Sequence, residues 1–263
     1  LDIQQQLRPD LRIVIMSATL DGEKLATQIQ APRLSSQGKS YPVDISHFPV
    51  RKDEMLNNQC KRAIEQALQQ HPGDVLVFLP GRREIQALQK LLEPLANACL
   101  QVLPLHGDLP IEQQSQVLHA TPEGIRRIVL ASNVAESSVT LPSVRVVIDS
   151  GLAREPRFDP NSGFSRLDLV TISQASADQR AGRAGRVSAG FCYRLWPASQ
   201  RLEAMRRAEI QHSELTSLAL ELASWGSSDL PFVDAPPIGP WQAAKDLLRS
   251  LGALDAQQSI TPL

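Results

Sequence analysis

The run Val75-Leu76-Val77-Phe78-Leu79 is wholly apolar, and the pair Pro80-Gly81 ends it. A short, continuous apolar run of this kind is typical of a strand buried on both faces of a parallel sheet. Similar runs recur along the chain and alternate with helical patterns, which predicts a parallel sheet covered by helices on both faces. The predicted strands are residues 11–16, 75–79, 101–105, 127–131, 144–148 and 190–196. The predicted helices are residues 20–30, 54–70, a segment ending at 95, 110–118, 198–207, 213–225 and 240–251.

Residues 31–49 are rich in proline and glycine, which predicts an irregular connector. Within this connector, Gly38-Lys39-Ser40 resembles the end of a phosphate-binding loop. Such a loop needs a second glycine five residues before Gly38, and Arg33 stands there. We therefore interpret the segment as a linker between two domains.

The composition is that of a globular protein, because 42% of the 263 residues are hydrophobic. The formal net charge of -1 excludes a basic surface over the whole molecule. Any nucleic-acid-binding surface must therefore be local. Residues 179–207 provide a local basic stretch, with seven arginines and a single acid, Glu203.

The three cysteines, Cys60, Cys99 and Cys192, are odd in number and widely spaced. This spacing predicts neither a disulfide framework nor a zinc site, and it suits a reducing cytosol. No apolar run reaches the roughly 18 residues that span a bilayer, and the N-terminus has no signal-peptide pattern. A cytoplasmic location without membrane contact is therefore predicted.

The octet Gln179-Arg180-Ala181-Gly182-Arg183-Ala184-Gly185-Arg186 places an arginine at every third position. On a helix this spacing aligns the guanidinium groups along one face. Like charges repel, so the row favours a bound anion, and the guanidinium fork suits phosphate oxygens. A solvated basic surface is the alternative. Gly182 and Gly185 argue against it, because each costs a helix about 1 kcal/mol relative to Ala, a loss that close approach of another backbone or a ligand would explain.

Residues 154–172 contain two extended runs on either side of Pro160-Asn161-Ser162-Gly163, which predicts a β-hairpin. The pattern alone fits an ordinary surface hairpin as well as a functional one.

The octet resembles the Q-R-x-G-R-x-G-R motif that closes the second RecA-like domain of superfamily 2 DEAH/DExH-box RNA helicases. Further motifs of that family occur in the expected order, and the set is most similar to bacterial HrpB-type ATP-dependent helicases. They are Ser17-Ala18-Thr19, Phe78-Leu79-Pro80-Gly81, Leu105-His106-Gly107 and Ala131-Ser132-Asn133-Val134-Ala135-Glu136-Ser137-Ser138-Val139-Thr140.

The resemblance implies an α/β fold: a RecA-like parallel sheet with helices on both faces, followed by a small, mostly helical, winged-helix-like domain. Residues 1–40 would be the end of a first RecA-like domain and a linker. Residues 41–197 would be the second RecA-like domain, with the hairpin at 154–172. Residues 198–263 would begin the winged-helix-like domain.

The resemblance also implies a function, as part of an ATP-dependent RNA helicase that couples nucleotide hydrolysis between two RecA-like domains to movement along RNA or its unwinding. Arg183 and Arg186 would be arginine fingers on the γ-phosphoryl group of ATP or another nucleoside triphosphate. Gln179 would bind the nucleotide and orient the attacking water or a phosphate oxygen, and Arg180 would brace the loop. Ser17 and Thr19 would couple nucleotide state to domain movement.

RNA would lie as a single strand in a groove across the RecA-like domains. The residues that the resemblance assigns to RNA are Gly107, Ser132, Asn133 and Thr140. Hydroxyls and backbone amides of this kind suit phosphates and 2′-hydroxyls and read no base sequence. The hairpin would separate the strands.

The sequence departs from the family at several points. Pro142 stands where an Asp commonly contacts the ribose, and Leu118 stands where several relatives have a base-stacking aromatic residue, with His119 beside it. No Walker A motif and no Asp-Glu-x-His occur, so the magnesium ligands are expected upstream of Ser17 in a preceding RecA-like domain, and this chain alone is expected to be inactive. Two alternatives remain: an RNA-binding module without enzymatic activity, and a DNA-directed helicase of superfamily 2.

Overall fold

The computed structural model describes residues 6–16, 22–35, 40–120, 122–137, 141–159, 162–226, 230 and 232–261. The chain divides into two compact units. The larger unit contains residues 38–156 and 166–206, and the smaller contains residues 1–37, 157–165 and 207–263.

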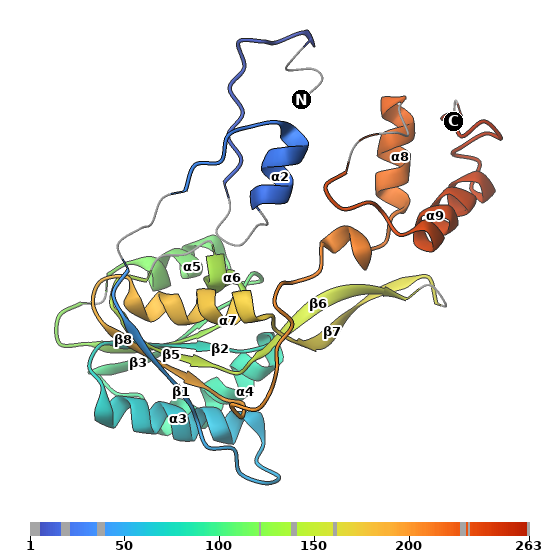
Figure 1. Cartoon of the computed structure of the whole chain (residues 1–263). Helices are drawn as coiled ribbons and strands as arrows, with labels where there is room; N and C mark the ends of the chain where they lie inside the picture. Colours follow the sequence, from blue (N-terminus) through green and yellow to red (C-terminus); the bar gives the residue numbers. More distant parts are fainter. Residues whose placement is uncertain are drawn as a thin grey trace. The chain divides into compact units, whose positions relative to one another are not determined.

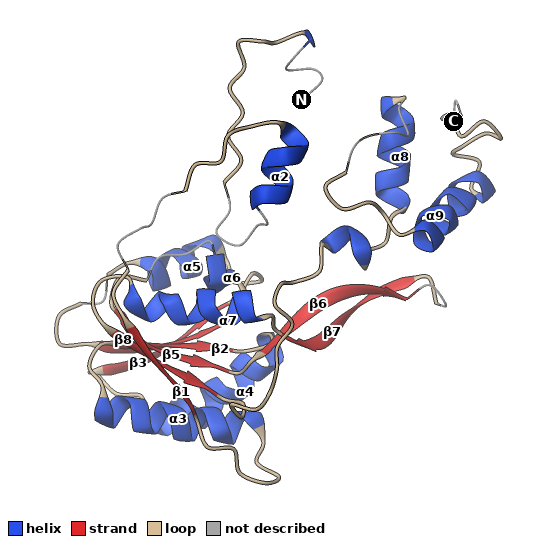
Figure 2. Ribbon diagram, in the orientation of Figure 1, coloured by secondary structure: helices blue, strands red, loops and turns tan. Residues whose placement is uncertain are grey.

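The larger unit is built on a parallel sheet of six strands in the order β1-β8-β5-β2-β4-β3 (Figures 1 and 2). Every neighbouring pair is parallel, which confirms the predicted sheet. The strands are β1 (Val43–His47), β2 (Asp74–Phe78), β3 (Leu100–Leu105), β4 (Arg126–Ala131), β5 (Val144–Asp149) and β8 (Gly190–Arg194).

Helices cover both faces of this sheet, as predicted (Figure 2). One face carries α3 and α4, and the other carries α5, α6, α7 and the 3-10 helix η2. The bounds are α3 (Leu56–Gln70), α4 (Arg82–Leu92), η1 (Glu93–Leu95), α5 (Ile111–Leu118), α6 (Val134–Ser137), α7 (Gln174–Ala181) and η2 (Gly182–Gly185).

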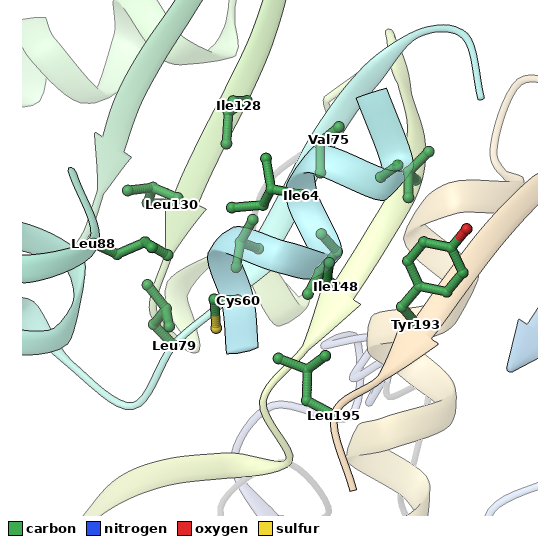
Figure 3. Close-up of a cluster of buried hydrophobic side chains, with 14 of the residues drawn as sticks. Cys60, Ile64, Val75, Leu79, Leu88, Ile128, Leu130, Ile148, Tyr193 and Leu195 are labelled. Atoms are coloured by element: carbon green, nitrogen blue, oxygen red, sulfur yellow. The ribbon is translucent and has the colours of Figure 1, made fainter. Parts of the chain in front are cut away.

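The alternation of side chains along β2 explains why both faces need cover. Val75 and Val77 point into the cluster that contains Ile64 and Leu88, whereas Leu76 and Phe78 point into the opposite cluster. Figure 3 shows the first of these cores. Each fully buried aliphatic side chain of this kind contributes about 1.5–3 kcal/mol to folding.

The predicted connector at residues 31–49 is wrong for residues 43–47, which form β1 at the edge of the sheet. Ile45 lies opposite Cys192 of β8. The strand is short and partly exposed, so it lacks the apolar run that marks a buried strand. Prolines at positions 42 and 49 bracket it, and proline is tolerated at the ends of an edge strand.

The predicted buried strand at residues 11–16 is also wrong. These residues have no regular structure, and their side chains are exposed, as with Val14 at 75% and Met16 at 86%. A strand needs a neighbour for its main-chain hydrogen bonds. None of the described residues provides a neighbouring strand for this run. The helix predicted at 20–30 is present as α2 (Gly22–Ile29).

The predicted helix at residues 198–207 is wrong, because this segment is irregular. The carbonyl oxygens of Glu203 and Ala204 accept hydrogen bonds from the backbone nitrogens of Gln174 and Ala175, at 2.8 and 3.1 Å. These donors belong to the first turn of α7. The backbone N–H groups of a first helical turn have no acceptors within the helix. The segment therefore caps a neighbouring helix instead of forming one.

The predicted hairpin is confirmed as the two-stranded sheet of β6 (Leu152–Asp159) and β7 (Phe164–Thr171). At its turn, Gly163 donates a backbone hydrogen bond to Asp159 at 2.9 Å, and Pro160 and Asn161 lie outside the described residues.

The smaller unit contains the two helices predicted near the C-terminus. They are α8 (Thr216–Trp225) and α9 (Ile238–Ser250), preceded by the 3-10 helix η3 (Glu209–Gln211). Leu215, Ala219, Ala244, Leu248 and Leu254 form their shared core. Among the described residues of the whole chain, no helix is long and apolar enough to cross a membrane.

Candidate functional site

The loops that carry the predicted motifs follow β2, β3 and β4, so they lie at one edge of the parallel sheet. Because β4 and β5 flank β2, the order of the strands reverses at β2. The carboxyl edge at such a reversal is where open α/β sheets bind ligands. Ser132 donates its backbone N–H to Leu105 at 3.1 Å, which holds the loops after β3 and β4 side by side.

The predicted RNA-binding residues differ in their exposure. Gly107 and Asn133 are exposed at this edge, and Gly107 lies beside Val134, since a Cβ atom placed on it would be 3.9 Å from Val134 Cγ2. Ser132 is only 8% exposed, so its hydroxyl has little free surface. Thr140, Ser17 and Thr19 lie outside the described residues.

The three arginines do not form one exposed row, because they differ in burial. The α-helix ends at Ala181 and continues as the 3-10 helix η2 to Gly185. Arg180 is 1% exposed and Arg183 is 5% exposed, whereas Arg186 is exposed.

The two glycines of the octet play different parts. A Cβ atom on Gly185 would lie 2.5 Å from the carbonyl oxygen of Tyr41, and Tyr41 donates its own N–H to Gly185 at 2.9 Å. A Cβ atom on Gly182 would meet nothing within 4 Å. The predicted close approach of another backbone is therefore confirmed at Gly185, where the other backbone is that of Tyr41, shortly before β1. It is not found at Gly182.

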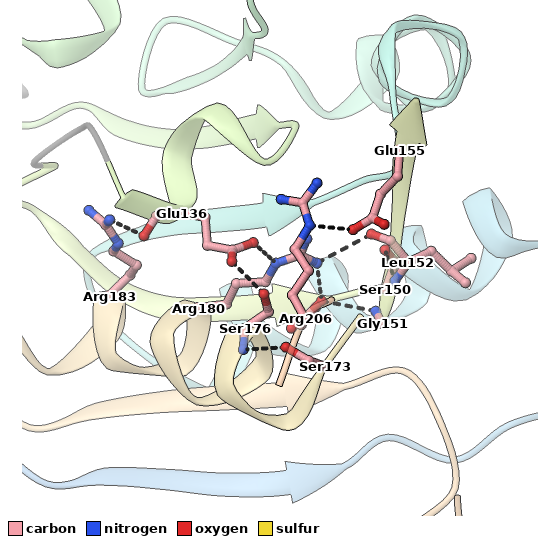
Figure 4. Close-up of polar contacts among 11 residues, drawn as sticks. Glu136, Ser150, Gly151, Leu152, Glu155, Ser173, Ser176, Arg180, Arg183 and Arg206 are labelled. Atoms are coloured by element: carbon pink, nitrogen blue, oxygen red, sulfur yellow. Dashed lines mark hydrogen bonds and ion pairs between the residues drawn. The ribbon is translucent and has the colours of Figure 1, made fainter. Parts of the chain in front are cut away.

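Arg180 is the centre of a buried ionic network (Figure 4). Its Nε lies 3.0 Å from Glu136 Oε2, and its Nη1 lies 2.8 Å from Asp149 Oδ1. The guanidinium group also lies 4.8 Å from the centre of the Phe78 ring. Arg180 therefore fastens α7 to the ends of β2 and β5 and to α6, in agreement with the predicted bracing role.

Glu136 joins several parts of this network. Its Oε1 accepts a hydrogen bond from Ser176 Oγ at 2.6 Å, and its main-chain carbonyl accepts one from Arg183 Nη2. Its backbone nitrogen donates to Asn133 at 2.9 Å. A single residue thus connects the loop predicted to bind RNA with two of the three arginines.

Asp149 is completely buried at the end of β5. Burial raises the pKa of this carboxyl group, while the charge of Arg180 and the N–H of Gly151, 2.9 Å away, act in the opposite direction. The positive charge of Arg180 therefore stabilises the ionised form of Asp149.

Arg183 and Arg186 lie close together over the face of the sheet. They line one small hollow together with Leu76, Leu141 and Val144. Burial, followed by the nearby charge of Arg186, lowers the pKa of Arg183 to about 10. Two guanidinium groups placed side by side in this way suit the oxygen atoms of a phosphate group. Gln179 is partly buried in the last turn of α7.

Sequence reasoning gave no role to Glu136, Asp149 or Ser176. Asp149 carried a usable signal, because a carboxylate at the end of the buried run Val144–Asp149 needs a cation. The position of Glu136 depends on tertiary packing and had no such signal.

The positions at which the sequence departs from the helicase pattern can also be placed. Leu118 packs partly buried against the core on the α5 face, and Pro142 is exposed. The described residues contain no group of three or more His, Cys, Asp or Glu side chains that could hold a metal ion.

Comparisons with known proteins show which family the chain resembles. The helicase conserved C-terminal domain matches residues 56–188. The chain is 40% identical to the ATP-dependent RNA helicase HrpB of Escherichia coli (strain K12), over 98% of this chain and 33% of that protein. It is 36% identical to the pre-mRNA-splicing factor ATP-dependent RNA helicase prp22 of Schizosaccharomyces pombe (strain 972 / ATCC 24843), over 97% of this chain and 23% of that protein.

The same relationship holds in three dimensions. The crystal structure of the Escherichia coli DEAH/RHA helicase HrpB matches with a TM-score of 0.92 and 39% identity, covering 99% of this chain and 34% of that one. The chain thus spans about a third of the length of HrpB. The RecA-like fold and the predicted resemblance are confirmed, and the chain belongs to the helicase conserved C-terminal domain family.

Proposed function

We propose that this chain is part of an ATP-dependent RNA helicase. Residues 41–197 are its second RecA-like domain, residues 1–40 are the end of the first RecA-like domain and a linker, and residues 198–263 begin a winged-helix-like domain. The proposal draws support from HrpB and prp22, which are both named ATP-dependent RNA helicases and are several times longer than the matched region.

The observation that carries the proposal is the pair Arg183 and Arg186. Arg183 is anchored to the carbonyl of Glu136, and its pKa is lowered to about 10 by burial and by Arg186. Phosphoryl transfer places charge on the γ-phosphoryl oxygens, and preorganised guanidinium groups stabilise that charge. Both arginines act as fingers in our proposal, and Gln179 orients the attacking water or a phosphate oxygen.

RNA binds, in this proposal, along the carboxyl edge of the sheet. Gly107 and Asn133 are exposed there, Ser132 precedes Asn133, and Thr140 follows in the same sequence motif, outside the described residues. Contacts to phosphates and 2′-hydroxyls would hold a single strand without reading its sequence. The β6–β7 hairpin then separates the strands of a duplex.

The chain fits one part of an ATP and Mg²⁺ site. Arg183 and Arg186 supply cations for the phosphates, and the described residues hold no acidic cluster for a metal. We therefore assign the Mg²⁺ ligands and the phosphate-binding loop to a preceding RecA-like domain in the same protein, and we propose that the protein works in the cytoplasm.

Phosphate release by the 263-residue chain and by the full-length protein tests this proposal. We expect no release from the chain alone, and release from the full-length protein that RNA stimulates more than DNA of the same sequence does. Hydrolysis by the chain alone would overturn the assignment of domains. RNA binding by the full-length protein without hydrolysis would indicate a non-enzymatic module, and stronger stimulation by DNA would indicate a DNA-directed helicase.

A further inference from the structure

The root of the β6–β7 hairpin is held by ion pairs on both faces. Arg154 and Glu155 are consecutive residues of β6, so their side chains point to opposite sides. Arg154 Nη2 lies 2.8 Å from Glu84 Oε1, in the first turn of α4. Arg206 Nε lies 2.7 Å from Glu155 Oε1 (Figure 4).

Gly81 makes room for the first of these pairs. A Cβ atom on Gly81 would lie 3.0 Å from Arg154 Cδ and 3.1 Å from Arg154 Nε. A larger residue would therefore require the side chain of Arg154 to shift by a few tenths of an ångström. The absence of a side chain at Gly81 thus leaves space for Arg154 beside the loop that follows β2.

The Glu84–Arg154 pair is the better protected of the two. The side chains of Arg154 and Glu84 are 31% and 23% exposed, whereas in the second pair Glu155 is 15% exposed and Arg206 is 53% exposed. Glu84 is also the third residue of α4, where a carboxylate is favourable beside the helix N-terminus. The second pair is more strongly screened by solvent.

An isolated two-stranded hairpin is at best marginally stable in water, so contacts outside it support this one, among them the apolar cluster of Ala153 and Ile172 with Ala177 and Trp196. We propose that Glu84 and Arg154 are positioning residues that fix the direction of the hairpin root, residues 152–156 and 166–171 of the larger unit, relative to the sheet, with Glu155 and Arg206 as a weaker second restraint. The functional consequence rests on the proposed function. A hairpin that separates the strands of a duplex must keep its orientation while the duplex is pulled against it.

The restraint itself can be measured on the 263-residue chain. Spin labels at Gln69→Cys on α3 and Leu167→Cys on β7, both exposed positions of the larger unit, report the distance between hairpin and sheet in a Cys99→Ser background. We expect a broader distance distribution in Glu84→Gln and in Arg154→Gln, and a narrower one again in the charge-reversed double variant Glu84→Arg/Arg154→Glu.

A matched control is Glu65→Gln, which removes the partly exposed pair with Lys61 on α3 and should leave the distribution unchanged. Circular dichroism of each variant checks that the fold is kept. A distribution as narrow in Glu84→Gln and Arg154→Gln as in the unaltered chain would overturn the inference.

The consequence is measured in the full-length protein. Duplex unwinding by Glu84→Gln should fall by about threefold to tenfold, equivalent to about 0.7–1.4 kcal/mol, while RNA-stimulated hydrolysis stays unchanged. Unwinding at the unaltered rate despite a broadened distribution would overturn the link between hairpin direction and unwinding. If the unaltered protein neither hydrolyses ATP nor unwinds RNA, the proposed function fails while the distance measurement still decides the positioning role.

Discussion

Nη1 of Arg180 lies 2.8 Å from Oδ1 of Asp149, and the two side chains are 1% and 0% exposed. This pair joins the helix that carries the arginine motif to the end of a central strand. The second carboxylate on Arg180, that of Glu136, comes from the loop predicted to bind RNA. The two predicted binding regions therefore share one buried anchor.

Replacing Asp149 with Ala should destabilise the chain by about 3 kcal/mol or more, because it leaves the buried Arg180 with one carboxylate in place of two. Urea unfolding of the 263-residue chain measures this loss. The control is Asp246→Ala, which removes an exposed pair with Arg249 and should cost less than about 1 kcal/mol. Equal losses in the two variants would contradict the anchoring role of Asp149.

Gly185→Ala and Gly182→Ala form a matched pair within one motif. The added methyl group at 185 would clash with the carbonyl of Tyr41, so we expect a loss of about 1–3 kcal/mol. The methyl group at 182 meets nothing within 4 Å, so this variant should be neutral or more stable by up to about 1 kcal/mol. Thermal melting of both variants decides the matter, and the reverse order of stabilities would refute the close approach of η2 to β1.

The central strands could be predicted because burial on both faces leaves a sequence signature. Val75 to Leu79 is wholly apolar, and the structure buries every residue of β2. The edge strand β1 could not be recognised, since Val43–His47 is half polar and gains its order from pairing with β8. Residues 11–16 have the signature of a buried strand without the neighbours that burial requires.

The arginine spacing predicted an anion-binding motif but not its geometry. The α-helix gives way to a 3-10 helix that ends at Gly185, beside Tyr41, a residue far away in sequence. For the same reason, the burial of Arg180 beside Asp149 and the link through Glu136 follow from packing and not from local pattern.

Glu136→Ala should lower kcat in the full-length protein much more than it raises KM. Without the carboxylate, α6 is no longer tied to Arg180 and Ser176, so the carbonyl that holds Arg183 loses its fixed position. Misplacement of a group that acts in the transition state by about 1 Å costs about a hundredfold, so a loss of about tenfold to a hundredfold is expected. Steady-state hydrolysis with saturating RNA measures it.

Two further variants serve as controls for Glu136→Ala. Glu136→Gln keeps a hydrogen-bond acceptor and should fall between Glu136→Ala and the unaltered protein. Glu112→Ala, at an exposed position on α5, should leave hydrolysis unchanged. A change in KM alone would show that Glu136 does not position Arg183.

The central claim is that Arg186 acts on charge that develops in the transition state. Steady-state hydrolysis by Arg186→Ala and Arg186→Lys in the full-length protein, with thermal melting as a folding control, tests it most directly. Arginine fingers contribute about 10³ to 10⁵ in rate, so we predict that kcat falls at least about a hundredfold in both variants, with little change in nucleotide affinity. Lys should not rescue, because a point charge cannot replace the planar guanidinium fork. A well-folded Arg186→Ala protein that keeps more than about a third of its kcat, a barrier change of less than about 1 kcal/mol, would contradict the account.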